Sequence, residues 1–313
     1  MWKMVRESRR FSCEWVISLG LMLIILTIDG ARAELLQWSL KPDFATCQKT
    51  DDAVWAEYAG GQDCIRFFSG GTIKDAPVVI VLLRGDTVGW VKRKPADIPD
   101  NTVKAQKGRA ERTAQVIDVP VIVLERPGTF GSTGNHLRRR QAPEFLALNS
   151  ALDAIKQRYN IQQFVLMGHS GGATAAAALL TLGRNDVSCA VLTSGAFGLL
   201  ERAQMLRAES GLKQRPGRDT TGLPTPYDPM EHIRGFVRNP QLKIIVIGNP
   251  RDRVAPFVLQ RRFVDLLTGN GYSAQLIVGG YYLLDIHGLK RKSSKLLFDK
   301  EKSAFQGFKV RRH

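Results

Sequence analysis

The chain is short of cysteine and lacks long apolar runs beyond its N-terminal region. Only four of its 313 residues are cysteine, and no His/Cys spacing typical of a metal site occurs. After residue 28, no run reaches the roughly 20 apolar residues that a membrane-spanning helix needs. The sequence also has no internal repeat of the kind that builds solenoids or propellers. These absences favour a globular fold with no metal or cofactor.

The N-terminus has the pattern of a secretory signal. Four basic residues among the first ten precede an apolar run over residues 15–28, and Ala31-Arg32-Ala33 places small residues where a signal peptidase reads the chain. We expect a signal peptide over residues 1–33, cleavage after Ala33, and export to the periplasm or the medium. An uncleaved anchor is the alternative, although the apolar run is short for a membrane span.

Export determines how the cysteines are interpreted. Cys47 and Cys64 lie near the mature N-terminus, and in an oxidising compartment we expect them to form a disulfide worth ~3 kcal/mol. Cys189 lies within an apolar strand pattern and is expected to be an inert core residue.

The net charge of +16 is the other marked bias of the composition. Basic residues gather at 92–94, at 138–140 and in the tail, for which we expect a basic helix or tail over residues 289–313. Nucleic acid is not an expected partner, because the protein is exported and the aromatic residues of the tail fit one packed helix face. We expect instead a basic surface suited to an anionic cell envelope.

Strand and helix patterns alternate along the chain. Short apolar runs predict strands at 53–58 and 64–68, joined by a hairpin at Gly60-Gly61, and further strands at 77–83, 120–124, 164–167, 189–192, 242–247 and 274–278. Helical patterns fall between them, over 103–115, 141–159 and 258–267. This order predicts one α/β domain over 34–313, with a mainly parallel sheet, helices on both faces and an antiparallel N-terminal edge. Residues 197–239 interrupt this alternation of strands and helices and are expected to form a lid or cap.

Ser170 lies in a segment whose pattern predicts a strand, a sharp turn and a helix. The apolar run ends in Gly168-His169-Ser170-Gly171-Gly172, and an alanine-rich stretch follows at once. Glycines at 168 and 172 allow the strand and helix to approach closely, and the helix N-terminus favours negative charge near the serine. The segment is typical of a nucleophile elbow. The alternative is a flexible turn with a solvated serine, since a chain with 29 glycines produces Gly-x-Ser-x-Gly by chance.

A serine nucleophile needs a base and a carboxylate that orients the base. His287 follows the last strand, at the sheet edge where the elbow also emerges, and is the expected base. His136 and His232 are the alternatives. Asp252 directly follows the preceding strand and is the expected acid, unless it only caps its own turn. Asp285 is its rival, although it lies only two residues from His287.

Two backbone donors are needed to stabilise a tetrahedral oxyanion. The N–H of Gly171 follows the nucleophile, and the loop after the strand at 77–83 supplies the second, for which we favour Asp86 over Gly85. Arg84 and His169 are candidate substrate-binding residues, with an ion pair to a surface carboxylate as the alternative for Arg84.

Together these residues resemble the α/β-hydrolase fold superfamily. Ser170, Asp252 and His287 stand in its order of nucleophile, acid and base, and residues 126–132 resemble a loop that follows a neighbouring strand in many members. Residues 227–233 are similar to a segment of the prolyl-oligopeptidase-like and dienelactone-hydrolase-like branches. The chain departs from the family in two places. Asp252 lies one position later than in the usual Gly-x-x-Asp-x-x-Val turn, and Arg84 stands where many members have histidine.

The resemblance implies a serine hydrolase that needs no cofactor. It would cleave an ester, thioester or amide bond of a small-molecule or peptide substrate through an acyl-enzyme intermediate. Two other functions stay open: an exported binding protein that has lost turnover on the same scaffold, and acyl transfer to an acceptor other than water.

Overall fold

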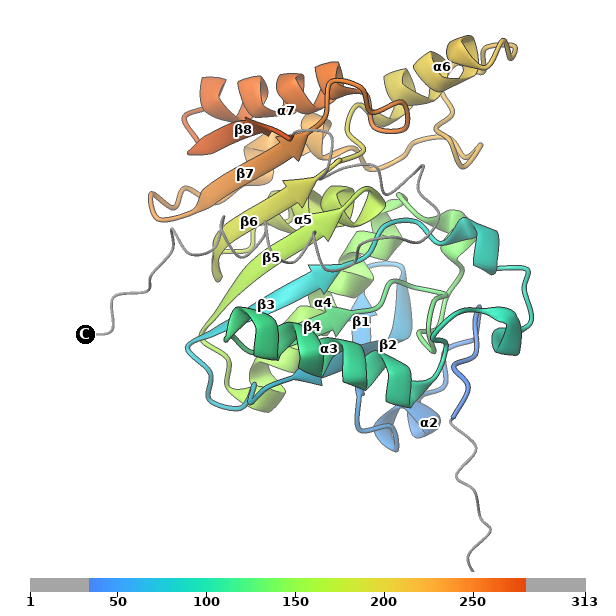
Figure 1. The fold of residues 1–313 in the computed structure, drawn as a ribbon, viewed down its shortest axis with the longest axis vertical. Coiled ribbons are helices and arrows are strands. Elements are labelled where there is room, and N and C mark those ends of the chain that lie inside the picture. Colours follow the sequence, from blue (N-terminus) through green and yellow to red (C-terminus); the bar gives the residue numbers. More distant parts are fainter. Residues whose placement is uncertain (1–33, 280–313) are drawn as a thin grey trace, which may run out of the picture. The chain divides into compact units, whose positions relative to one another are not determined.

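A single eight-stranded sheet organises the computed structural model, which describes residues 34–279 (Figure 1). Its strand order is β1-β2-β4-β3-β5-β6-β7-β8. The strands are β1 (Ala53–Tyr58), β2 (Gly61–Gly70), β3 (Val78–Leu83), β4 (Val121–Leu124), β5 (Gln163–His169), β6 (Val187–Thr193), β7 (Lys243–Gly248) and β8 (Ala274–Val278). The predicted strands are all present, and β2 is longer than its apolar pattern suggested.

The direction of the strands also confirms the prediction. β1 and β2 form an antiparallel hairpin, and β2 is antiparallel to β4. The other neighbouring pairs, from β4 with β3 through to β7 with β8, are all parallel. The tight turn at Gly60, with φ of 91°, suits a hairpin. The parallel strands need longer crossovers, and helices supply most of them.

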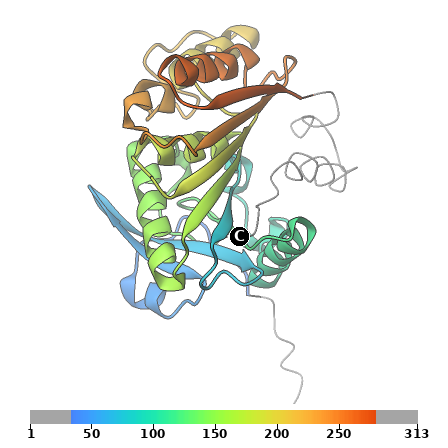
Figure 2. The same cartoon turned by 90° about the vertical axis from the view of Figure 1, so that its left-hand side faces the viewer.

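Helices cover both faces of the sheet, as Figure 2 shows. α4 (Ala142–Tyr159), α5 (Gly171–Thr181) and α7 (Phe257–Gly269) contribute to the core on one face, whereas α3 (Val103–Ile117) packs on the other. Successive side chains of β3 point to opposite faces of the sheet. Val79 and Val81 therefore pack in the core on the α4 face, and Ile80 packs in the core on the α3 face. The continuous apolar run of this strand follows from burial on both faces.

The alanine-rich helix α5 lies directly behind the centre of the sheet. Every one of its residues is buried, and small side chains let its backbone approach β5 and β6 closely. Alanine also has the highest intrinsic helix propensity. The alanine-rich composition therefore favours a fully buried helix, which begins immediately after Ser170.

Residues 197–239, for which a lid or cap was expected, contain two helical segments. Their first helix, α6 (Leu199–Glu209), lies beyond the tips of β6 and β7 (Figure 1). Their second helical segment, η4 (Pro229–Gly235), packs instead against α5 and α7. The remaining short helical segments are α2 (Phe44–Gln48), η1 (Val88–Trp90), η2 (Pro95–Asp97) and η3 (His136–Arg138).

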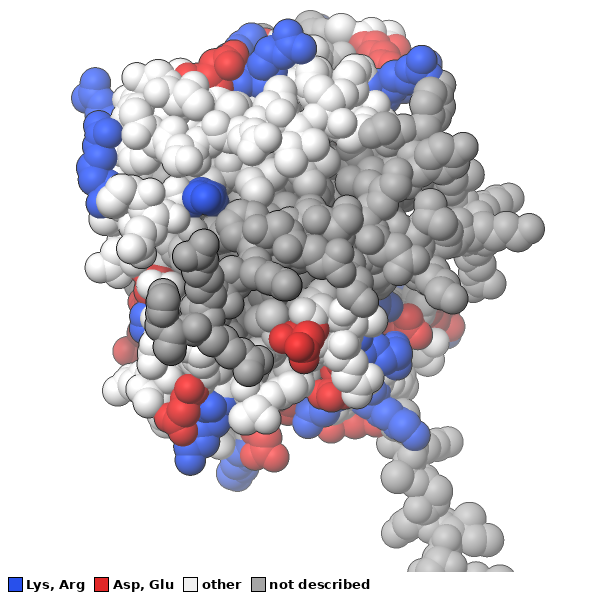
Figure 3. Space-filling model, turned by 60° about the vertical axis from the view of Figure 1, so that its left-hand side comes forward, with Lys and Arg blue, Asp and Glu red and all other residues white. Residues whose placement is uncertain are grey.

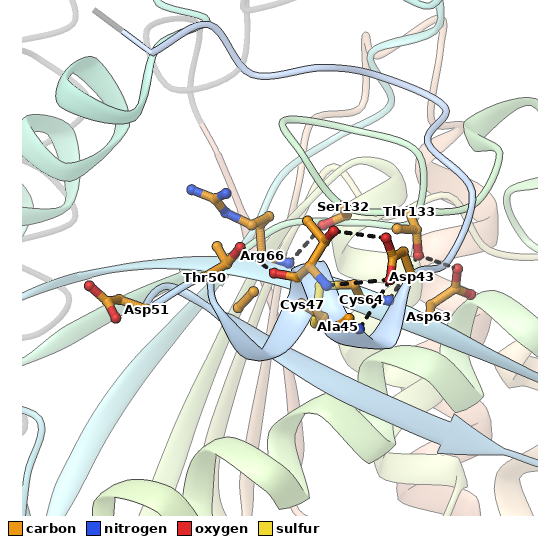
Figure 4. The surroundings of a disulfide bond; sticks show 12 residues. Asp43, Ala45, Cys47, Thr50, Asp51, Asp63, Cys64, Arg66, Ser132 and Thr133 are labelled. Carbon is orange, nitrogen blue, oxygen red and sulfur yellow. Dashed lines mark hydrogen bonds between the residues drawn. A yellow bond between two sulfur atoms is a disulfide. The ribbon is translucent and has the colours of Figure 1, made fainter. Parts of the chain in front are cut away.

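The expected disulfide is present between Cys47 in α2 and Cys64 in β2 (Figure 4). Thr133 makes two hydrogen bonds to the backbone of Cys64. Its hydroxyl accepts from the Cys64 N–H, and its own N–H donates to the Cys64 carbonyl. The disulfide therefore ties α2 to the sheet and, through Thr133, to the loop after β4. Cys189 is buried in β6, as predicted.

The charged residues visible on the face shown in Figure 3 are of both signs. Within residues 34–279, no helix is both long and apolar enough to cross a bilayer. The predicted signal peptide, the basic tail at 289–313, Asp285 and His287 lie outside the described residues.

Candidate active site

Ser170 occupies the turn between β5 and α5 in a conformation that L-residues rarely adopt. Its φ is 54° and its ψ is −120°, and such a backbone persists only where the surroundings hold it. The Ser170 N–H donates to the Thr193 carbonyl at 2.9 Å, and the Ala173 N–H donates to the Ser170 carbonyl at 3.0 Å. The strand-turn-helix order expected of a nucleophile elbow is therefore present, with the strain at the serine itself.

The glycines around Ser170 are required by close backbone contacts. A Cβ on Gly168 would lie 2.4 Å from the Gly172 carbonyl oxygen, and one on Gly172 would lie 2.0 Å from the Leu83 carbonyl oxygen. A Cβ on Gly171 would meet the Asp86 carboxylate at 2.0 Å. At Gly168 and Gly172 the clash is with backbone, whereas at Gly171 it is with a carboxylate that arginines hold in place. The contacts at Gly171 and Gly172 show that the elbow packs directly against the loop after β3.

That loop brings the Asp86 backbone close to the Gly171 backbone, which begins α5. A Cβ on Gly85 would lie 3.3 Å from the Ser170 Cβ, so the loop touches the elbow there as well. Neither the Asp86 N–H nor the Gly171 N–H donates to an acceptor within residues 34–279. Both residues expected to form the oxyanion hole therefore lie side by side, and their N–H groups remain available.

The Asp86 carboxylate is bound by three arginines. Arg126 Nη1 donates to Asp86 Oδ1 at 2.7 Å, Arg139 Nε donates to Oδ2 at 3.0 Å, and Arg140 Nη2 also donates to Oδ2. Burial alone would raise the pKa of Asp86, but Arg140, Arg126 and Arg139 outweigh it and hold that pKa well below its ordinary value. The side chain is therefore ionised, and it fixes the loop whose backbone is expected to carry one oxyanion donor.

The network continues from Asp86 into α4 and the insertion. Arg126 Nε donates to Glu144 Oε1 at 2.7 Å. Arg140 lies 3.5 Å from Asp219 Oδ2 and donates to the Thr220 hydroxyl, to which Arg202 of α6 also donates. Burial, reinforced by Arg140, lowers the pKa of Arg202 to about 9. This set, which we call the arginine network, ties the insertion to the carboxyl edge of the sheet.

The arginine network was not predicted from the sequence. Residues 138–140 were expected to lie on a basic surface, but Arg139 and Arg140 are buried, with side chains only 9% and 2% exposed. The one available signal was Glu144, an acidic residue in the first turn of the helix that follows. Glu144 is itself buried and also accepts from the Arg140 N–H at 2.6 Å.

Asp252 lies in the loop after β7, where it was expected. Its Oδ1 accepts from the N–H groups of Val254 and Ala255, both at 2.8 Å. This is the turn-capping role that the sequence left open. However, Oδ2 is buried and has no hydrogen-bond partner within residues 34–279. A buried carboxylate oxygen without a donor is costly, so one oxygen shapes the turn and the other is open to a further donor.

Two of the alternative bases are poorly suited to deprotonate Ser170. His136 is 1% exposed, and its Nε2 accepts from the Thr87 N–H at 3.2 Å. Burial, reinforced by Arg126, lowers the pKa of His136 to about 3. His232 stacks on Tyr227, whose hydroxyl contacts Thr181 at the far end of α5. That helix of 11 residues is about 16 Å long, which separates His232 from the elbow.

The two candidate substrate-binding residues already have protein partners. Arg84 lies 3.1 Å from Glu125, donates to Gln106 and stacks over the Phe130 ring at 4.7 Å. This is the ion-pair alternative, although Glu125 is buried and not on the surface. The Nδ1 of His169 lies 3.0 Å from the Thr193 hydroxyl. Within the described chain, no cluster of His, Cys, Asp and Glu suits a metal ion.

No protein-family model and no curated protein sequence matches the chain. Solved structures do match. An esterase of Pyrococcus furiosus has a TM-score of 0.56 at 12% identity, over 88% of this chain and 96% of the esterase. Acylaminoacyl peptidase of Pyrococcus horikoshii has a TM-score of 0.51 at 12% identity, over 92% of this chain and 43% of the peptidase. Prolyl oligopeptidase B of Galerina marginata has a TM-score of 0.54 at 13% identity, over 80% of this chain and 35% of that enzyme.

The chain thus spans less than half the length of the two peptidases and nearly all of the esterase. At this level of identity the likeness concerns the fold. The chain has the α/β-hydrolase fold, with the sheet and the antiparallel N-terminal edge that the resemblance implied.

Proposed function

We propose that this protein is a serine hydrolase that cleaves an ester, thioester or amide bond through an acyl-enzyme on Ser170. The observation that carries the proposal is the strained Ser170 backbone at the start of α5, with the free N–H groups of Gly171 and Asp86 beside it. A solvated serine in a flexible turn would need neither this strain nor three glycines without room for a side chain.

Asp252 is the proposed acid, and its unpartnered Oδ2 supports that role. A triad carboxylate accepts from the imidazole Nδ1–H and holds the ring in one tautomer. Oδ1 is already held by two backbone N–H groups. The carboxylate is therefore oriented in advance, and its remaining oxygen is the one that would receive the histidine.

His287 is the proposed base. The Gly279 N–H donates to the Gly248 carbonyl at 2.9 Å, so the described chain ends beside the loop that carries Asp252. Eight further residues reach at most about 26 Å. The segment that carries His287 therefore starts at the carboxyl edge of β7 and β8, which supports His287 as the base.

In the proposed reaction, His287 removes the Ser170 proton as Oγ attacks the acyl carbon. The Gly171 and Asp86 N–H groups stabilise the oxyanion, and His287 then protonates the leaving group. Water, activated by the same histidine, releases the acyl group and restores the serine. The names of the structural neighbours, an esterase and two peptidases, agree with acyl chemistry on this scaffold.

A panel of para-nitrophenyl esters and peptide anilides tests this function. We expect turnover by the protein, loss of that turnover by at least about a thousandfold in Ser170→Ala, and unchanged turnover in Ser210→Ala, an exposed serine at the end of α6. Absence of turnover across the panel, or turnover that survives Ser170→Ala, would refute the proposal. Analysis of the products separates hydrolysis from acyl transfer.

Export is a separate proposal, with residues 1–33 as a signal peptide. The Cys47–Cys64 disulfide supports it, because such bonds persist mainly in oxidising compartments. The mass of the protein recovered from an exporting cell should correspond to a chain that begins at Glu34. Recovery of the full-length chain alone would contradict cleavage after Ala33.

A further inference from the structure

A cavity of about 500 Å³ lies beside the arginine network, and Arg139 and Glu144 belong to both. It opens between the tip of the β1–β2 hairpin, the loop after β4 and the N-terminus of α4. We call it the hairpin pocket; its charged and polar lining includes Lys41, Tyr58, Asp63, Arg138, Arg139 and Gln141.

The acidic groups of the hairpin pocket are already satisfied within the protein. Asp63 Oδ1 accepts from the Thr133 hydroxyl and Oδ2 from the Tyr58 hydroxyl, both at 2.6 Å. Glu144, which also lines the pocket, accepts from Arg126 at one oxygen and from the Arg140 N–H at the other. Neither carboxylate has an oxygen left without a donor.

In contrast, the hydrogen-bond donors that line the pocket outnumber the acceptors available to them. The side chains of Lys41 and Arg138 form no ion pair or hydrogen bond with any residue of 34–279. Gln141 Nε2 is buried and has no acceptor there. Arg139 donates to Asp86 through Nε, while its other guanidinium nitrogens have no acceptor in the described chain.

The N-terminus of α4 adds to this excess. Gln141 is the N-cap, and its side chain makes no capping hydrogen bond. Among the first three positions of the helix, only the Ala142 N–H has no acceptor in the described chain, because Pro143 has no N–H and the Glu144 N–H donates to the Gln141 carbonyl at 3.1 Å. The pocket therefore combines cationic side chains and amide donors around carboxylates that are already occupied.

We propose that the hairpin pocket binds a carboxylate group. Arg139 connects this pocket to Asp86, and Asp86 carries one of the proposed oxyanion donors. Two sources supply the same chemistry: a distal carboxylate on the acyl substrate itself, or a separate small carboxylate. The first source rests on the proposed hydrolase function, whereas the second does not.

The test compares a pocket variant, Lys41→Gln with Arg138→Gln, with a control variant, Lys92→Gln with Arg93→Gln. Both remove two exposed positive charges, and the control removes them from a run outside the pocket. Arg139 is left intact because it holds Asp86. Binding of succinate is measured by calorimetry at constant ionic strength, so that general screening is the same for all proteins.

The second arm measures hydrolysis of para-nitrophenyl acetate and of the mono-para-nitrophenyl ester of succinate, which carries a free carboxylate. We expect succinate affinity to fall at least about tenfold in the pocket variant and to stay unchanged in the control. If the carboxylate belongs to the substrate, KM for the succinate ester also rises about tenfold, while the acetate is unaffected.

Identical behaviour of the pocket variant, the control and the wild type in both arms would overturn the proposal. Loss of succinate binding in a protein that hydrolyses neither ester would support the pocket and count against the hydrolase function. The two proposals therefore fail through different measurements.

Discussion

Two aspartates at the carboxyl edge of the sheet are held in opposite ways. Asp86 follows β3, and three arginines bind its two oxygens. Asp252 follows β7; one of its oxygens binds only backbone N–H groups, and the other has no partner within residues 34–279. Both carboxylates follow parallel strands at the same edge of the sheet, so position alone does not distinguish their roles.

The difference in partners does distinguish them. A carboxylate that arginines saturate has no free lone pair aimed at a reacting group, and its contribution is to hold backbone in place. A carboxylate with one fixed and one open oxygen is suited to orient a histidine. In the proposed mechanism, the Asp86 side chain therefore holds the loop and its N–H stabilises the oxyanion, whereas Asp252 acts through its carboxylate.

The largest effect on activity is expected for Asp252→Asn. The amide oxygen still accepts from Val254 and Ala255, so the turn survives, but the NH₂ group no longer accepts from an imidazole. We expect kcat to fall by roughly 10³–10⁴-fold, with the free energy of unfolding changed by no more than about 1 kcal/mol. Steady-state kinetics and urea unfolding check both values.

Asp285→Asn is the matched comparison, since Asp285 is the rival acid. Its turnover should stay within a few-fold of the wild type. If Asp285→Asn lost turnover and Asp252→Asn kept it, the acid would be Asp285, and the open oxygen of Asp252 would have no catalytic meaning.

Asp86→Asn should affect stability most. The substitution leaves Arg139 buried without a carboxylate and removes one of the two carboxylates that Arg140 contacts, and removal of one partner from such a buried pair costs about 3–5 kcal/mol. Asp100→Asn is the control, because its ion pair with Arg109 at 2.8 Å is exposed and should be worth less than about 1 kcal/mol. Equal urea midpoints for the two variants would show that the arginine network does not stabilise the fold.

A smaller effect concerns the pH dependence of stability near Asp86. His136 has a pKa of about 3 in the folded protein, against an ordinary value of 6.5. Because the unfolded chain binds the proton first, stability should fall as the pH drops from about 6.5 towards 3. His136→Gln keeps an acceptor for the Thr87 N–H and should reduce this loss by roughly 1–3 kcal/mol. An unchanged pH profile of unfolding would mean that His136 titrates normally.

The elements that depend on local pattern were predictable from the sequence. The apolar run of β3 indicated a strand buried on both faces, and the glycines around Ser170 indicated a turn with no room for side chains. The arginine network was not predictable, because it joins Asp86 to residues 40 and 54 positions away. A run of arginines looks the same in sequence whether it is solvated or buried. Only the folded structure shows which carboxylates lie beside these arginines.

The central claim is that Ser170 is an activated nucleophile. The most direct measurement is incubation of the protein with a fluorophosphonate probe, followed by digestion and mass spectrometry of the labelled peptide. We predict a single adduct on the peptide that contains Ser170, and none in Ser170→Ala. An adduct on another residue, or an unlabelled protein at probe concentrations that saturate a known serine hydrolase, would contradict the account.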